Sequence, residues 1–243
     1  MNDNKLMENC QICGNELDYF DNGKELCCEI CEKIEIGNIY CDKGHYVCNE
    51  CHDKSAFDIV QDYGLTTKSK DPFEIAEMLM SIKDKVPMLG CANAWIATVS
   101  LMAALKNEGT IQVSNEQIIE ALNRTNRQAI GGYCGLTGVC GIVPAIGASF
   151  SVILGAACKK DQETAKTMKI VGKIVNVIAD ETGPCCCKNF VRTALLEAMK
   201  LAKDELGVKW IVTGNNITCT HSERHPHGCR KNKCRYFNFV NFN

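Results

Sequence analysis

Five cysteines in two glycine-containing segments are the residues of this sequence best suited to chemistry. Cys134 and Cys140 lie in GGYCGLTGVCG, which leads into an apolar helix expected over residues 142–158. Three consecutive cysteines, Cys185–Cys187, lie in GPCCCKN at the start of another expected helix. Helix N-termini carry unpaired N–H groups and partial positive charge, which favour a thiolate over a thiol. We therefore interpret the two segments as walls of one metal or cluster site.

A [4Fe-4S] cluster is the cofactor that such a site would suit best. The cluster and its thiolates are anionic overall, so glycine and helix N–H groups directed at the sulfurs stabilise it. Ligation by only three cysteines leaves one iron open as a Lewis acid for a substrate oxygen or sulfur. In the helix that follows, Lys188 or Arg192 could anchor a substrate carboxylate, although a solvated helix surface is the simpler interpretation of Arg192. Tyr133 is the nearest candidate for a proton acceptor.

Further cysteines could complete the cofactor site. Cys91 stands at the start of a helix expected over residues 92–106 and is either a ligand or a core residue. The C-terminal segment CTHSERHPHGCRKNKCRYF contains Cys219, Cys229 and Cys234, three histidines and five basic residues. These cysteines could ligate an iron–sulfur cluster or a zinc ion, or attach the tail to the body. The sequence leaves open whether they share the central site, and whether the basic residues contact phosphate.

The N-terminal residues 1–55 form an acidic, cysteine-dense module. Four ligand pairs follow one another at spacings typical of zinc sites: Cys10 and Cys13, Cys28 and Cys31, Cys41 and His45, and Cys48 and Cys51. Eight ligands suffice for two tetrahedral zinc ions, whose binding would supply the folding energy of so short a segment. The pairing could be sequential or interleaved. The order of the pairs resembles zinc modules of the RING or treble-clef kind, and a purely structural role is the favoured interpretation.

Composition limits the classes of protein to which the chain can belong. Its 243 residues carry a net charge of −2, which argues against a surface built for nucleic acid. Eighteen cysteines without an N-terminal signal peptide indicate metal or redox chemistry in the cytoplasm rather than structural disulfides. The apolar stretches 89–105 and 142–158 are too short for a spanning helix, so no membrane contact is expected. A small-molecule substrate is expected, and an oligomer is possible.

The remaining pattern predicts a mostly α fold in three parts: the zinc module 1–55, a helical cluster-binding domain 56–210 and a basic tail 211–243. Helices are expected over 56–83 with a break near Gly64, and over 92–106, 115–124, 142–158, 161–180 and 185–206. Asp71-Pro72 and Ser114 are expected to open two of them. The helix after Cys140 has so little side-chain bulk that we expect it in the middle of the bundle. Residues 208–213 are the one plausible strand of this domain, with extended chain as the alternative.

Two family resemblances follow from these motifs. Residues 131–202 resemble the iron–sulfur serine dehydratase α-domain and the related cysteine desulfidases, whose pattern is a cysteine loop, a small-residue helix, an amphipathic helix and a Pro-Cys motif opening another helix. This resemblance implies that Cys134 and Cys185 are cluster ligands, with Cys140, Cys186 or Cys187 in place of a third. The whole chain resembles an uncharacterised cysteine-rich family of anaerobes, with the motifs GHYVC, GC, CG-x-x-G-x-CG and GP-x-CCK.

Three functional hypotheses remain at this stage. The favoured one is an iron–sulfur enzyme of lyase or desulfidase type that acts on a small hydroxy or thiol compound through an open cluster iron. The alternative is a non-enzymatic zinc- and cluster-binding protein for metal or sulfur handling or for scaffolding. The third is a redox carrier with a fully cysteine-ligated cluster.

Overall fold

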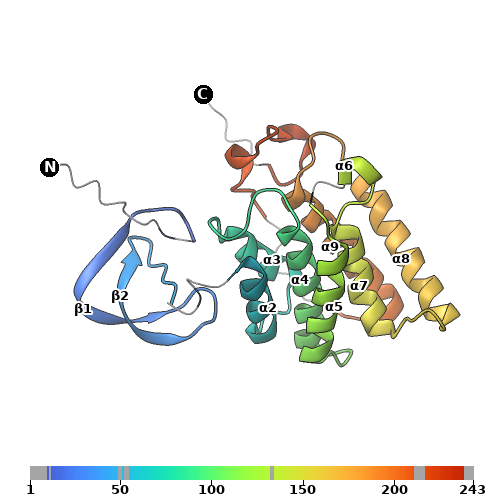
Figure 1. Cartoon of the computed structure of the whole chain (residues 1–243), viewed down its shortest axis with the longest axis horizontal. Helices are drawn as coiled ribbons and strands as arrows, with labels where there is room; N and C mark the ends of the chain where they lie inside the picture. Colours follow the sequence, from blue (N-terminus) through green and yellow to red (C-terminus); the bar gives the residue numbers. More distant parts are fainter. Residues whose placement is uncertain are drawn as a thin grey trace.

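A computed structural model describes residues 10, 12–48, 51, 55–131, 134–210 and 217–237. Within them the chain forms a small N-terminal β module and a larger helical domain, with the C-terminal tail folded over one end of the helices (Figure 1). The prediction of a mostly α protein is confirmed. Tyr133 and residues 211–213 of the expected strand lie outside the described residues.

The N-terminal module is built on a two-stranded antiparallel ribbon. Strand β1 (Leu17–Cys27) pairs with β2 (Ile34–Cys41), and the register shifts between Tyr19 and Lys24. The first cysteine pair precedes β1 and the third begins at the last residue of β2, so both lie at one end of this ribbon, whereas the second pair follows β1 at the other end. The ribbon therefore brings together cysteines that are far apart in the sequence.

The helical domain contains seven longer helices among the described residues. Their bounds are α2 (Ala56–Thr66), α3 (Pro72–Ser81), α4 (Ala92–Glu108), α5 (Asn115–Gln128), α7 (Ile142–Leu154), α8 (Asp161–Ala179) and α9 (Cys187–Leu206), with a single turn, α6 (Cys134–Thr137), before α7. The expected openings are confirmed: Asp71 caps α3 with Pro72 at its first position, and Ser114 and Gln117 form a capping box at α5.

Helix α4 is the centre of this bundle. Thirteen of its 17 residues are buried, on every side of the helix, and it packs against α2, α3, α5, α7 and α9. A helix that is apolar all round belongs in a core. The small-residue helix α7 lies beside it and also contacts α5, α8 and α9. The tight approach is visible at Gly147, where a β-carbon would lie 2.7 Å from a Val171 methyl group.

The structure corrects several expected boundaries. Gly64 does not break a helix but lies inside α2, at a close contact with Val99 of α4, and the chain turns at 67–71 instead. Helix α7 ends at Leu154, because Gly155 adopts a left-handed φ of +65° and caps it. The described part of the expected strand, 208–210, is not a strand.

The tail, residues 217–237, contains the 3-10 turns η1 (Ser222–Arg224) and η2 (Lys231–Lys233). It returns on itself, since Cys219 N–H donates to the Tyr236 carbonyl at 2.7 Å. Two arginine side chains attach it to the helical domain: the half-buried Arg224 donates to the Lys83 carbonyl, and the buried Arg230 donates to the Thr182 carbonyl. Two of its five basic residues therefore bind the protein itself rather than facing solvent.

In the part of the chain that the structure describes, no helix has both the length and the apolar character needed to cross a membrane.

Candidate functional site

The eight predicted metal ligands of the N-terminal module form two compact groups. One consists of Cys10, Cys13, Cys41 and His45, and the other of Cys28, Cys31, Cys48 and Cys51. Within each group the ligand atoms all lie within 4.8 Å of one another. The first pair thus joins the third and the second joins the fourth. The pairing, which the spacing left open, is interleaved.

The distances inside these groups match a tetrahedral ion. Four thiolates bound to zinc at about 2.3 Å in a tetrahedron would have their sulfurs about 3.8 Å apart. The Cys13 and Cys41 sulfurs are 3.8 Å apart, and those of Cys31 and Cys48 are 3.7 Å apart. His45 Nδ1 lies 3.3 Å from the Cys41 sulfur. Both groups could therefore hold one metal ion each.

A second candidate site is a cavity of about 280 Å³ at the end of the helical domain that the tail covers. Five cysteines and one histidine line it: Cys91, Cys134, Cys140, Cys185, Cys187 and His227. Four of the five central cysteines singled out in the sequence thus meet at one cavity, together with Cys91. The cysteines come from three separate stretches of the chain, and the tail adds His227 as a fourth.

Three long helices begin at this cavity. Cys91 is the N-cap of α4, Cys140 directly precedes the N-cap of α7, and Cys187 is the first residue of α9. Each helix start supplies N–H groups that have no partner within the helix, and the positive end of its dipole. The convergence of three such ends makes the cavity a favourable place for negative charge, whether on thiolates or on an anionic cofactor.

Hydrogen bonds and burial set the protonation of the cavity's thiols. The Cys187 sulfur accepts two hydrogen bonds, one from the Cys185 thiol and one from the Gly90 N–H at 3.4 Å. These two hydrogen bonds lower the pKa of Cys187 to about 7. The same hydrogen bond with Cys187 raises the pKa of Cys185. Burial raises the pKa of Cys140 to about 12, although the Ile142 N–H in the first turn of α7 opposes the rise. Gly90 makes its contact from a φ of +124°, which only glycine adopts readily.

Cys186 is not part of this cavity's lining, although its two neighbours are. As the N-cap of α9 it faces the other way and is only 8% exposed. Its sulfur lies near Cys219 and Cys234 of the tail, whose negative charges raise the Cys186 pKa in addition to the larger effect of burial. The three consecutive cysteines are therefore divided between two groups of thiols.

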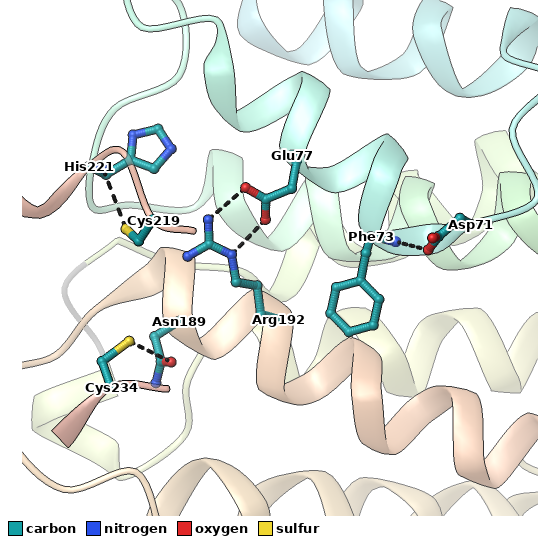
Figure 2. A network of polar contacts seen from close by, with 8 residues as sticks. All are labelled: Asp71, Phe73, Glu77, Asn189, Arg192, Cys219, His221 and Cys234. Atoms are coloured by element: carbon teal, nitrogen blue, oxygen red, sulfur yellow. Dashed lines mark hydrogen bonds and ion pairs between the residues drawn. The ribbon is translucent and has the colours of Figure 1, made fainter. Parts of the chain in front are cut away.

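The predicted anchoring residues lie behind the cavity wall rather than in it. Lys188 is fully buried and does not line the cavity, and burial lowers its pKa to about 7. Arg192 is 1% exposed, so its interpretation as a solvated surface residue is wrong. Its guanidinium forms two parallel hydrogen bonds with the Glu77 carboxylate, at 2.6 and 2.7 Å (Figure 2). The carboxylate that Arg192 binds is thus the protein's own.

His227 is the cavity residue that the sequence analysis did not single out. Its neighbour His225 accepts the His227 N–H at Nδ1 and contacts the Cys185 carbonyl through Nε2 at 2.9 Å. These contacts place the HPH segment of the tail at the rim of the cavity. The only available signal was the concentration of histidines in the tail, which does not indicate to which site a histidine folds back.

Comparison with known proteins adds a family but no activity. The sequence of residues 60–237, which make up most of the helical domain and the tail, matches a protein family described as a family of unknown function (DUF5714). No curated protein and no solved structure matches the chain. The resemblance to iron–sulfur serine dehydratases thus has no support from these comparisons.

Proposed function

The chain belongs to the DUF5714 family, and we propose that it is an iron–sulfur-cluster-dependent enzyme of lyase or desulfidase type, acting on a small hydroxy or thiol compound in the cysteine-lined cavity. A single observation carries the proposal: five thiols and three helix N-termini converge on one cavity of about 280 Å³. A cavity of this kind offers room beside the thiols for a small substrate.

The spacing of the thiols favours a cluster over a single ion. The two groups in the N-terminal module hold their ligand atoms within 4.8 Å of one another, whereas the cavity's cysteines form no such compact group among the described residues. Thiolates on different irons of a cluster are farther apart than thiolates on one ion. Five thiols exceed the three needed to leave one iron open for substrate. When bound, such a cluster supplies a Lewis acid to a substrate oxygen or sulfur.

The resemblance to serine dehydratases assigns Cys134 and Cys185 as two ligands. For the third, the structure supports Cys140 or Cys187, which line the cavity, and not Cys186, which lies outside it. The cavity's own residues perform the remaining tasks in this proposal. The helix N–H groups stabilise negative charge on bound thiolates and on a substrate carboxylate. His227, at the rim, is positioned to accept or return a proton, the role first considered for Tyr133.

We further propose that the two compact groups of the N-terminal module bind zinc. The ligand sets, three cysteines with one histidine and four cysteines, are those of structural zinc sites, and their sulfur separations fit a tetrahedron. A module of two strands with so small an apolar core would draw its stability from these ions. Its role is structural in this proposal.

The test is anaerobic purification followed by iron, zinc and sulfide analysis and electron paramagnetic resonance. We expect about two zinc ions per chain and a [4Fe-4S] signal that shifts when candidate thiols or hydroxy acids are added. Cys134→Ser or Cys185→Ser should remove this substrate-responsive signal and leave the zinc content unchanged. Cys158→Ser, at an exposed cysteine between α7 and α8, is the matched control and should change neither. Two zinc ions and no iron would overturn the enzyme proposal.

One observation favours the non-enzymatic alternative, a protein that delivers or scaffolds a cluster. Three large apolar side chains are exposed among the described residues of the segment that carries Cys134 and Cys140: Leu136 is 79%, Ile130 56% and Val139 49% exposed. Exposed apolar residues next to a site are typical of protein contacts. The experiment above separates the two, because a delivery protein would lose its cluster to an apo-acceptor protein and show no signal shift with small substrates.

A further inference from the structure

We propose that Cys186, Cys219 and Cys234 hold a second iron–sulfur cluster, on the opposite side of the α9 N-terminus from the central cavity. The three consecutive cysteines then contribute to two sites: Cys185 and Cys187 face the cavity, and Cys186 faces the tail. This site goes beyond the proposed function, because it does not depend on what the cavity holds.

One residue of α9 touches two of the three sulfurs. Asn189 N–H donates to the Cys186 sulfur, and the Cys234 thiol donates to Asn189 Oδ1 at 3.5 Å (Figure 2). The Asn189 side chain is fixed in turn by Glu181, to which its Nδ2 donates at 2.7 Å. Cys186 and Cys234 therefore share one neighbour at the start of α9, although they are far apart in the sequence.

The third sulfur is brought to the same place by the fold of the tail. Cys219 pairs with Tyr236 through the backbone, and the Tyr236 ring lies under the Arg192 guanidinium at 5.0 Å. Arg192 also lies within reach of the Cys219 thiol, and Figure 2 shows the two side chains next to each other. All three cysteines thus lie near one another at the start of α9.

Each sulfur already accepts a backbone N–H group in the manner of a metal-bound thiolate. The donors are His221 N–H to Cys219 at 3.4 Å, Tyr236 N–H to Cys234, and Asn189 N–H to Cys186. The same arrangement occurs in the N-terminal module, where Cys48 N–H donates to the Cys28 sulfur at 3.4 Å. N–H groups directed at sulfur stabilise the thiolate over the thiol.

The charges around these thiols call for an anionic partner. Three cations are almost fully buried here: Lys188, Arg192 and Arg230. Glu77 and Glu181 are the carboxylates paired with them among the described residues. The Lys188 Nζ atom, the Arg230 Nε and Nη1 atoms and His221 Nδ1 are buried without a hydrogen-bond partner in that part of the chain. Buried polar atoms and charges without partners are costly. An iron–sulfur cluster with three thiolates supplies the missing negative charge.

The spacing of the sulfurs favours a cluster over one ion. Cys186, Cys219 and Cys234 do not form a compact group like the two in the N-terminal module. A single tetrahedral ion would therefore require the sulfurs to move together, whereas a cluster spans the wider separation.

The test compares iron and acid-labile sulfide in anaerobically purified full-length variants. If both centres are filled, Cys186→Ser, Cys219→Ser and Cys234→Ser should each retain roughly half the wild-type iron, corresponding to one of two clusters. Cys185→Ser should lose the other half, and the Cys185→Ser/Cys186→Ser double variant nearly all. If the cavity holds no cluster, Cys186→Ser should lose all the iron and Cys185→Ser should lose none. That result would refute the proposed function and support the present inference. Cys158→Ser is again the control.

A measurement on the wild-type protein covers the case in which a variant fails to fold. Cysteine alkylation read by mass spectrometry should label Cys158 at once, and should label Cys186, Cys219 and Cys234 only after iron chelation. The inference is overturned if these three are labelled before chelation, if Cys186→Ser folds and retains wild-type iron, or if zinc replaces iron at these residues.

Discussion

Replacing Glu77 with glutamine should destabilise the helical domain by about 3 kcal/mol. Glu77→Gln removes the negative charge from a partner of Arg192, whose side chain is 1% exposed. In the wild-type protein burial lowers the Arg192 pKa and the hydrogen bonds to Glu77 raise it. The variant loses the effect of Glu77, but the guanidinium is so strong a base that it stays charged. The uncompensated cation is then left inside the protein.

The magnitude follows from the exposure of the two partners. Breaking a fully buried ion pair by removing one member costs about 3–5 kcal/mol. Glu77 is 30% exposed, and glutamine keeps one acceptor for one of the two hydrogen bonds, so the lower end of that range applies. Glu120→Gln is the matched control: it breaks the i,i+4 pair with Arg124, whose side chains are 52% and 41% exposed, and should cost no more than about 0.5 kcal/mol.

The assay is urea unfolding of the metal-loaded protein, followed by far-ultraviolet circular dichroism, which reports mainly on the helices. With a slope of about 2 kcal/mol per molar urea, 3 kcal/mol lowers the midpoint by about 1.5 M. The control should shift it by about 0.25 M or less. If Glu77→Gln moves the midpoint no more than Glu120→Gln does, Arg192 is not buried as an ion pair and the assigned packing of α3 against α9 is wrong.

Three further predictions concern other parts of the molecule. Cys41→Ser should lower the zinc content by about one ion per chain, measured by metal analysis, and leave the helical circular dichroism unchanged; loss of iron instead would contradict the separation of the module from the cavity. Ser114→Ala removes the capping box of α5 and should cost about 1 kcal/mol in urea unfolding; an unchanged midpoint would contradict it. Gly64→Ala should destabilise by about 1 kcal/mol, because overpacking against Val99, whose methyl would lie 2.3 Å from the new β-carbon, outweighs the gain in helix propensity. Gly172→Ala, with open space around the new β-carbon, should stabilise α8 instead, and calorimetric melting of the two variants would show opposite shifts.

Local sequence patterns predicted most of the helical architecture. The caps at Asp71 and Ser114 depend on neighbouring residues alone, and the structure confirms them. The sequence-based predictions were wrong where a contact with a residue distant in the sequence determines the structure. Gly64 looked like a helix break because glycine disfavours helices, yet it lies inside α2 because Val99 of α4 leaves no room for a side chain. Arg192 looked like a surface residue because Glu77, its partner, lies 115 residues earlier in the sequence.

The sequence by itself determined which residues could bind metals, because ligand types at short spacings are local properties: the four pairs of the N-terminal module, the cysteine loop before α7 and the run Cys185–Cys187. Only the tertiary structure decided how these ligands are grouped. The ribbon β1–β2 sets the interleaved pairing, and three helix starts bring Cys91, Cys140 and Cys187 to one cavity. The tertiary structure also directs the Cys186 side chain toward the tail and away from the cavity that Cys185 and Cys187 line. Side chains next to each other in the sequence point in different directions around a helix start, so which of them meet is settled only when distant segments pack.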